Sequence, residues 1–186
     1  MGVSGLLTIV LGAVTPGNMN RFIDDPTVTA RLPPWTGFMS TLGLFGWALS
    51  AGASGAAALA LAWRGSGRAR FFAATAALLV VLFVDDAFLF HDDIAPDRIG
   101  IPENVILALI AVVLASWAWR FRRQLAASHV GVLAVAAAAF AASTALDVTQ
   151  SYELEPLEEW LKLSGIIAVG GWALAAAAEA LDTLGS

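Results

Sequence analysis

Long runs of apolar residues, separated by short polar segments, dominate the chain. A membrane-spanning helix needs roughly 20 mostly apolar residues. Runs of about this length cover residues 35–63, 71–91, 101–119, 128–148 and 160–181. A shorter run, 3–14, is predicted as a first span; a re-entrant segment or a signal-peptide core is the alternative, although no basic segment precedes it. The pattern therefore predicts an all-α integral membrane bundle of about six helices. It forms a single domain over residues 1–186, with 15–34 as an outer loop.

The segments between the predicted spans alternate in charge. Arginines follow the second and fourth spans, at Arg64, Arg68, Arg70, Arg120, Arg122 and Arg123. Basic residues in short loops mark the cytoplasmic side of a membrane. We therefore expect a multi-pass protein of the cytoplasmic (inner) membrane with both termini in the cytoplasm. Thirteen of the 15 acidic residues then fall in the outer half, which carries a net charge of −9 opposite +4 at the inner face.

Composition excludes several classes of protein. Apolar residues make up 59% of the chain and charged residues 13%, whereas soluble domains have about 45–50% and about 25%. The net charge of −5 argues against nucleic acid, whose ligands are basic proteins. The absence of cysteine excludes disulfides, thiolate catalysis and cysteine-ligated metals. The expected partners are the lipid bilayer and other membrane proteins or a second copy of the chain.

Small residues recur on one face of the second predicted span. Gly46, Ser50 and Ser54 lie at intervals of four residues, which places them on one side of a helix. Such a stripe lets two helices approach closely. We expect it to pack within the bundle rather than against another chain.

Two adjacent acids lie inside the third predicted span. Asp85 and Asp86 follow Arg70 by about fifteen residues, which corresponds to roughly 22 Å of helix in a hydrocarbon layer of about 30 Å. Ionisable groups at such depth usually face a cavity, a partner or an ion. In the alternative interpretation, the span ends early and water reaches both carboxylates.

Helical phase indicates which of the nearby polar side chains can meet. At 100° per residue, Asp85, His91 and Asp92 share a face about 120° wide, whereas Asp86 faces a neighbouring helix. Convergence of all these groups on one point would require the helix to unwind near His91. Further acids lie at the outer ends of the fifth and sixth spans. The candidate metal ligands are Asp85, Asp86, His91, Asp92, Asp147, Glu158 and Glu159.

Lys162 is predicted as a counter-charge for the acids inside the membrane. It lies one turn after Glu158, so an ordinary ion pair between those two residues is the alternative. We expect Asp85, His91 and Asp92 to approach Glu158, Glu159 or Lys162 in the folded chain.

The two charged elements carry a resemblance. The run 83–92 contains D-D-x4-H-D, the segment Gly100-Ile101-Pro102-Glu103 follows, and the run 157–166 contains E-E-x2-K. In these features the chain resembles a group of uncharacterised bacterial multi-span membrane proteins with a D-D-x4-H-[DE] element and a later E-[DE]-x2-K element. The resemblance covers about residues 35–181. It implies no activity, only that the two elements act together.

Three functions fit these observations, and the sequence leaves open whether the protein is an enzyme. The favoured one is a non-catalytic, integral subunit of a larger membrane assembly, docked through its acidic outer face. The first alternative is an outward-facing site for a divalent zinc, manganese, iron or calcium ion, which as a catalytic centre would hydrolyse lipid-type substrates. The second is proton or cation handling, which the apolar run below Asp85 disfavours.

Overall fold

The apolar runs predicted from residue 35 onward all form helices. The computed structural model describes residues 30–33, 35–147 and 154–182, and this part of the chain contains no strand. In chain order the helices are α4 (Phe38–Trp63), α5 (Ala69–Ala87), the π-helix η1 (Phe90–Ile99), α6 (Glu103–Arg120), α7 (Arg122–Ala126), α8 (Val130–Asp147) and α9 (Glu155–Asp182). The predicted all-α class is confirmed for the described residues.

Four of these helices, α4, α6, α8 and α9, are long and apolar enough to cross a membrane. The pair α5 and η1 adds a fifth candidate span if it is counted as one broken segment. The described helices are therefore compatible with a multi-pass membrane protein. The predicted first span, 3–14, and most of the predicted outer loop, 15–34, lie outside the described residues.

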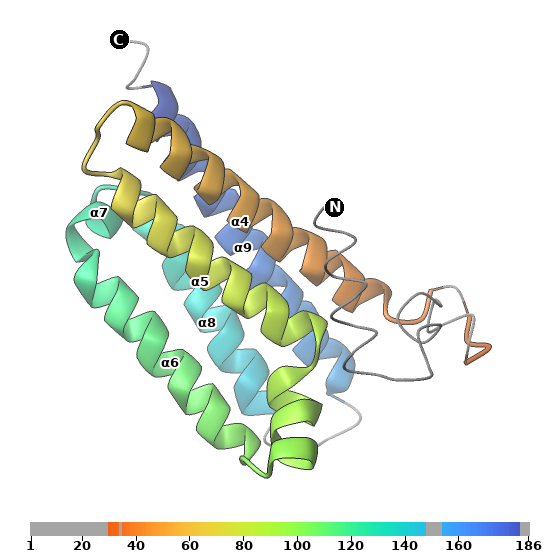
Figure 1. Ribbon diagram of the computed structural model, residues 1–186. Coiled ribbons are helices and arrows are strands. Elements are labelled where there is room, and N and C mark those ends of the chain that lie inside the picture. The colour runs from red at the N-terminus through yellow and green to blue at the C-terminus, as the bar shows by residue number, and fades with distance from the viewer. Residues whose placement is uncertain (1–29, 34, 148–153, 183–186) are drawn as a thin grey trace, which may run out of the picture. The chain divides into compact units, whose positions relative to one another are not determined.

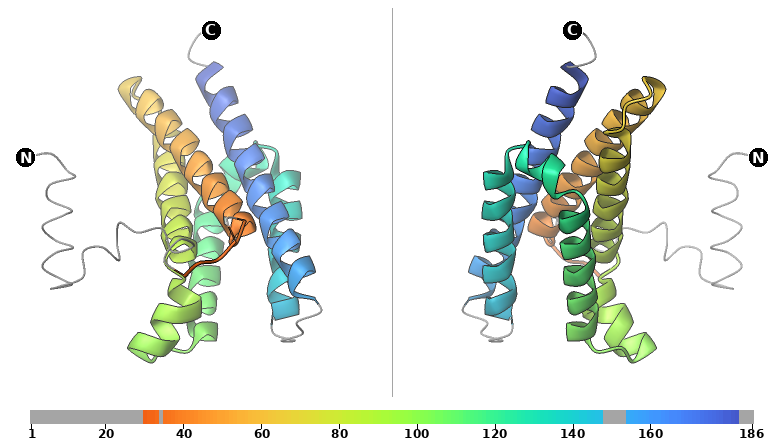
Figure 2. Two further views of the ribbon diagram at one scale, coloured as in Figure 1. Left: turned by 90° about the vertical axis from the view of Figure 1, so that its right-hand side faces the viewer. Right: turned by 90° about the vertical axis from the view of Figure 1, so that its left-hand side faces the viewer.

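The chain divides into two units, Met1–Phe38 and Met39–Ser186. In the first unit the described residues form turns that lead into the start of α4. The second unit contains the helices that form the candidate site. Within it, the helices run alongside one another, and the α4–α5 turn lies at the same end as α7 (Figures 1 and 2). This end carries the arginines predicted as two basic loops, and we call it the basic end.

The third predicted span, 71–91, is not one continuous helix. α5 ends at Ala87, and η1 departs from its direction by 65°. Leu89, between them, has a left-handed backbone with φ 49°. In η1 the Ile94 N–H donates to the Leu89 carbonyl at 3.2 Å, five residues back. Pro96 lies inside this helix; because a proline ring clashes with the α-helical carbonyl four residues earlier, the wider winding accommodates it.

Helix α4 packs closely on α9 through small residues. A Cβ atom on Gly46 would lie 2.6 Å from Ile166 Cγ2, and one on Gly170 would lie 3.2 Å from Ser50 Oγ. Ser50 and Ser54 are both buried. The small-residue stripe predicted on α4 therefore packs within the bundle, as expected.

An aromatic cluster fills the bundle near its basic end. The ring of Phe71 lies 5.1 Å from Phe72, 5.4 Å from Phe121 and 6.2 Å from Trp172, between ring centroids. Trp117 stacks on Phe71 at 6.2 Å, and its indole N–H donates to the Thr75 hydroxyl at 3.2 Å. The cluster joins three helices, α5, α6 and α9, and Phe121, which lies between α6 and α7. Offset and edge-to-face pairs of this kind stabilise a core beyond their buried area.

Helices α6 and α8 leave most of their apolar surface uncovered by the described residues. Ile106 is the buried residue of α6, and Ala136 and Ser143 are those of α8. Leu109, Val112 and Val135 are each more than half exposed. Apolar surface of this extent needs lipid or a protein partner to cover it.

Candidate functional site

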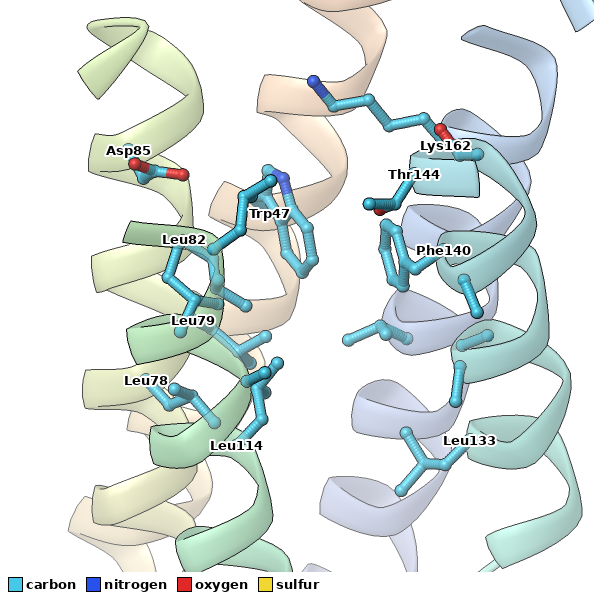
Figure 3. A pocket seen from close by; sticks show the side chains of 18 of the residues that line it. Trp47, Leu78, Leu79, Leu82, Asp85, Leu114, Leu133, Phe140, Thr144 and Lys162 are labelled. Carbon is cyan, nitrogen blue, oxygen red and sulfur yellow. The ribbon is translucent and has the colours of Figure 1, made fainter. Parts of the chain in front are cut away.

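A large cavity separates the helix pair α5 and α6 from the pair α8 and α9. Its volume is about 1390 Å³, above the range of about 300–1,000 Å³ that is usual for small-molecule pockets. Figure 3 shows leucines of α5 and α6 facing Leu133 and Phe140 of α8 across this space, with Trp47 of α4 beside them. We call it the central cavity.

The two ends of the central cavity differ in chemistry. Towards the basic end it is lined by Thr75, Trp117 and Trp172, which belong to or adjoin the aromatic cluster. At the opposite end, charged residues predominate, and we call this the acidic end. Its lining residues are Asp85, His91, Asp92, Glu103, Asp147, Glu155, Glu158, Glu159 and Lys162. Residues from both charged sequence elements therefore line one space.

His91 is held between two aspartates at the acidic end. Its Nδ1 lies 2.7 Å from Asp85 Oδ2, and its Nε2 lies 3.1 Å from Asp92 Oδ1. The side chains of Asp85 and His91 are 12% and 15% exposed. The break at Phe88–Leu89 turns η1 so that the His91 imidazole contacts Asp85. In a regular helix the two side chains would lie on the same broad face but further apart along the helix axis. Helical phase predicted that Asp85, His91 and Asp92 lie together, and they do, although the helix between them is broken.

Both ring nitrogens of His91 need a compatible partner. A doubly protonated imidazolium would donate to Asp85 and Asp92 at once. A neutral imidazole with its proton on Nδ1 would donate to Asp85 and direct the Nε2 lone pair towards Asp92, where a cation between them or a proton on the Asp92 carboxyl relieves the repulsion. A carboxylate that fixes the far nitrogen of a histidine is the usual second partner of a metal-binding histidine.

Glu103 completes a possible ligand set that the sequence reasoning missed. His91, Asp92 and Glu103 each offer one ligand atom, and these three atoms lie within 4.8 Å of one another. Glu103 opens α6 just after η1, so the chain returns it to the same end of the bundle. Its sequence signal was the Gly100-Ile101-Pro102-Glu103 segment, where the proline marks a helix start.

Asp86 forms an ion pair with Lys162. Lys162 Nζ lies 2.8 Å from Asp86 Oδ1, with side chains 31% and 12% exposed respectively. The ion pair joins α5 to α9, as helical phase predicted when it directed Asp86 to a neighbouring helix. α5 does end early, at Ala87, yet both aspartates are largely shielded from solvent.

The remaining predicted ligands lie on α8 and α9 at the acidic end. Asp147 ends α8, and Glu158 and Glu159 lie near the start of α9. All three line the central cavity, but they are outside the His91, Asp92 and Glu103 group. The acidic end therefore has two parts, a histidine-containing group on η1 and α6 and a carboxylate group on α8 and α9.

The chain belongs to the family described as Domain of unknown function (DUF8692), whose model matches residues 2–177. No curated protein and no solved structure matches it. Because the match spans almost the whole chain, the central cavity and both parts of the acidic end lie within the region that defines the family.

Proposed function

We propose that the protein is a six-span protein of the cytoplasmic membrane that binds a divalent metal ion through His91, Asp92 and Glu103. The acidic end faces outside, and both termini lie in the cytoplasm. The arginines gathered at the basic end support this orientation. The exposed apolar faces of α6 and α8 support a lipid surrounding.

The observation that carries the metal site is the way His91 is held. Asp85 Oδ2 lies 2.7 Å from Nδ1, Asp92 Oδ1 lies 3.1 Å from Nε2, and a ligand atom of Glu103 lies within 4.8 Å of those of His91 and Asp92. This combination of an oriented imidazole and two carboxylates suits zinc, manganese or iron, whereas calcium prefers oxygen ligands alone. A bound cation would also offset the repulsion between Asp92 and Glu103.

The position of the group beside the central cavity leaves room for a catalytic role. A metal ion there would have protein ligands on one side and the cavity on the other, so a water or substrate could complete its coordination. Such an ion lowers the pKa of its bound water and supplies a nucleophile near neutral pH. Hydrolysis of a lipid-type substrate is the catalytic form of this proposal.

Elemental analysis of the detergent-purified protein tests the metal site. We expect about one divalent ion per chain, lost in His91→Ala and retained in His129→Ala, whose imidazole pairs with Glu179 at 2.7 Å far from the site. Asp85→Asn should weaken metal affinity about 10–100-fold because Asp85 only orients His91. Asp97→Asn is its matched control. Equal metal content in wild type and His91→Ala, after reconstitution with each candidate ion, would contradict the proposal.

Membership of a larger assembly is the second candidate function. The exposed apolar residues of α6, among them Leu109 and Val112, could contact a partner helix as well as lipid. The expected result is a polypeptide that co-purifies at fixed stoichiometry in mild detergent and is released by Leu109→Ala with Val112→Ala. If the protein is found only as a monomer without partners in a mild-detergent extract of native membranes, this candidate function is wrong. Proton or cation handling is less favoured, because the aromatic cluster lies where a polar path would have to continue.

A further inference from the structure

We infer that the central cavity binds the single long apolar chain of an amphipathic amine, with the ammonium group at the acidic end. The inference rests on the cavity and on the carboxylates of α8 and α9. It goes beyond the metal site proposed above and does not require a bound metal.

The dimensions of the central cavity suit an extended chain. It is lined on α5 from Thr75 to Asp85 and on α8 from Val130 to Asp147. At 1.5 Å per residue, these stretches are about 15 Å and about 25 Å long. The cavity therefore runs along the helices rather than across them. At about 1390 Å³ it holds more than a compact small molecule.

The walls of the central cavity select for an apolar occupant. Small residues of α6 and α8 leave the space open, and leucines and other apolar side chains line the rest of it. The lining alanines are Ala111, Ala115, Ala118, Ala134, Ala136, Ala137 and Ala141. Ligand sites lined mainly by apolar side chains, with a few polar groups at one place, favour the apolar part of a ligand. The aromatic cluster at the basic end bounds the space, so a chain would enter with its polar head last.

The charge of the acidic end selects the head group. Its two basic side chains are already engaged, His91 with Asp85 and Asp92, and Lys162 with Asp86. Among the described residues, no ion pair includes the lining carboxylates of α8 and α9, which are Asp147, Glu155, Glu158 and Glu159. These carboxylates attract an ammonium group and repel a phosphate or carboxylate head.

Binding of three probes with the same chain tests the inference. Native mass spectrometry would compare dodecylamine, dodecanol and dodecanoate on the full chain, purified in a non-ionic detergent and stripped of metal with a chelator. We expect the amine to bind at least about tenfold more tightly than the other two, a difference of the size that one paired charge supplies. Because the protein is metal-free, failure of the metal proposal leaves this result unaffected.

Two pairs of variants locate the binding. Ala137→Phe adds a ring to the cavity wall and should weaken amine binding about tenfold, whereas Val135→Phe, at a residue of the same helix that does not line the cavity, should not. Asp147→Asn with Glu158→Gln should remove the preference for the amine, and Asp97→Asn should keep it. Equal binding of the three probes, or equal effects of Ala137→Phe and Val135→Phe, would show non-specific partitioning and overturn the inference. Binding of the amine only after metal is restored would also contradict the proposed contact between the ammonium group and the carboxylates.

Discussion

Asp85 and Asp86 are neighbours in the chain but have separate structural roles. Asp85 orients His91 at the acidic end, and Asp86 holds Lys162 of α9. Successive residues of a helix point about 100° apart, so one acidic pair can serve two partners. Substitutions at these positions should therefore have different consequences, one for ligand binding and one for stability.

Lys162→Met should destabilise the fold because it leaves Asp86 largely buried without its cation. We expect the free energy of unfolding to fall by about 3 kcal/mol, which is the lower end of the range for breaking a buried ion pair. The lower end applies because the Lys162 side chain is 31% exposed. Asp86→Asn with Lys162→Met should recover much of that loss. A double-mutant cycle, measured by denaturation in detergent micelles, gives the coupling. Strictly additive effects would show that the two side chains do not interact.

At the scale of elements, close helix contacts depend on single glycines. Gly165 of α9 faces Phe140 of α8, and a Cβ atom there would lie 2.9 Å from the ring. Gly171 lies six residues along the same helix with open space around its Cβ position. The two positions form a matched pair, alike in residue type and helix but different in packing.

Gly165→Ala should lower the melting temperature, because overpacking of this kind costs about 1–3 kcal/mol. Gly171→Ala should leave it unchanged or raise it, since alanine favours a helix over glycine by up to about 1 kcal/mol. Thermal unfolding of both variants in the same detergent is the measurement. Equal melting temperatures would mean that α8 and α9 are not in this contact.

The break between α5 and η1 was not predictable from the apolar pattern. The apolar run over 71–91 indicates a helix, and composition alone contains no sign of the turn at Leu89. Pro96 signalled an end a few residues later than the observed one. The hydrogen bonds of η1 and the contact between His91 and Asp85 outweigh the strain at Leu89, and these depend on the folded arrangement.

At the scale of the whole molecule, the proposed orientation can be tested in cells. The chain contains no cysteine, so single cysteines can be introduced without removing any. Asp97→Cys, in η1, should react with a membrane-impermeant maleimide in intact cells. Ser66→Cys, in the α4–α5 turn, should react only after the membrane is opened. The reverse pattern would place the acidic end in the cytoplasm.

Apolar periodicity and loop charge determined the helical class, the approximate bounds of α4, α6, α8 and α9, and the separation of acidic from basic ends. These are local properties, because burial in lipid or core requires long apolar runs wherever the chain crosses. The pairing of Asp85, His91 and Asp92 was also accessible, since these residues are close along the chain. Only the tertiary structure decided that Glu103 joins them, that Asp86 is the acid with which Lys162 pairs, and that a large cavity lies between α5–α6 and α8–α9. Those features depend on the distances between helices and on the helix faces that meet. Side-chain packing between segments far apart in the sequence sets both.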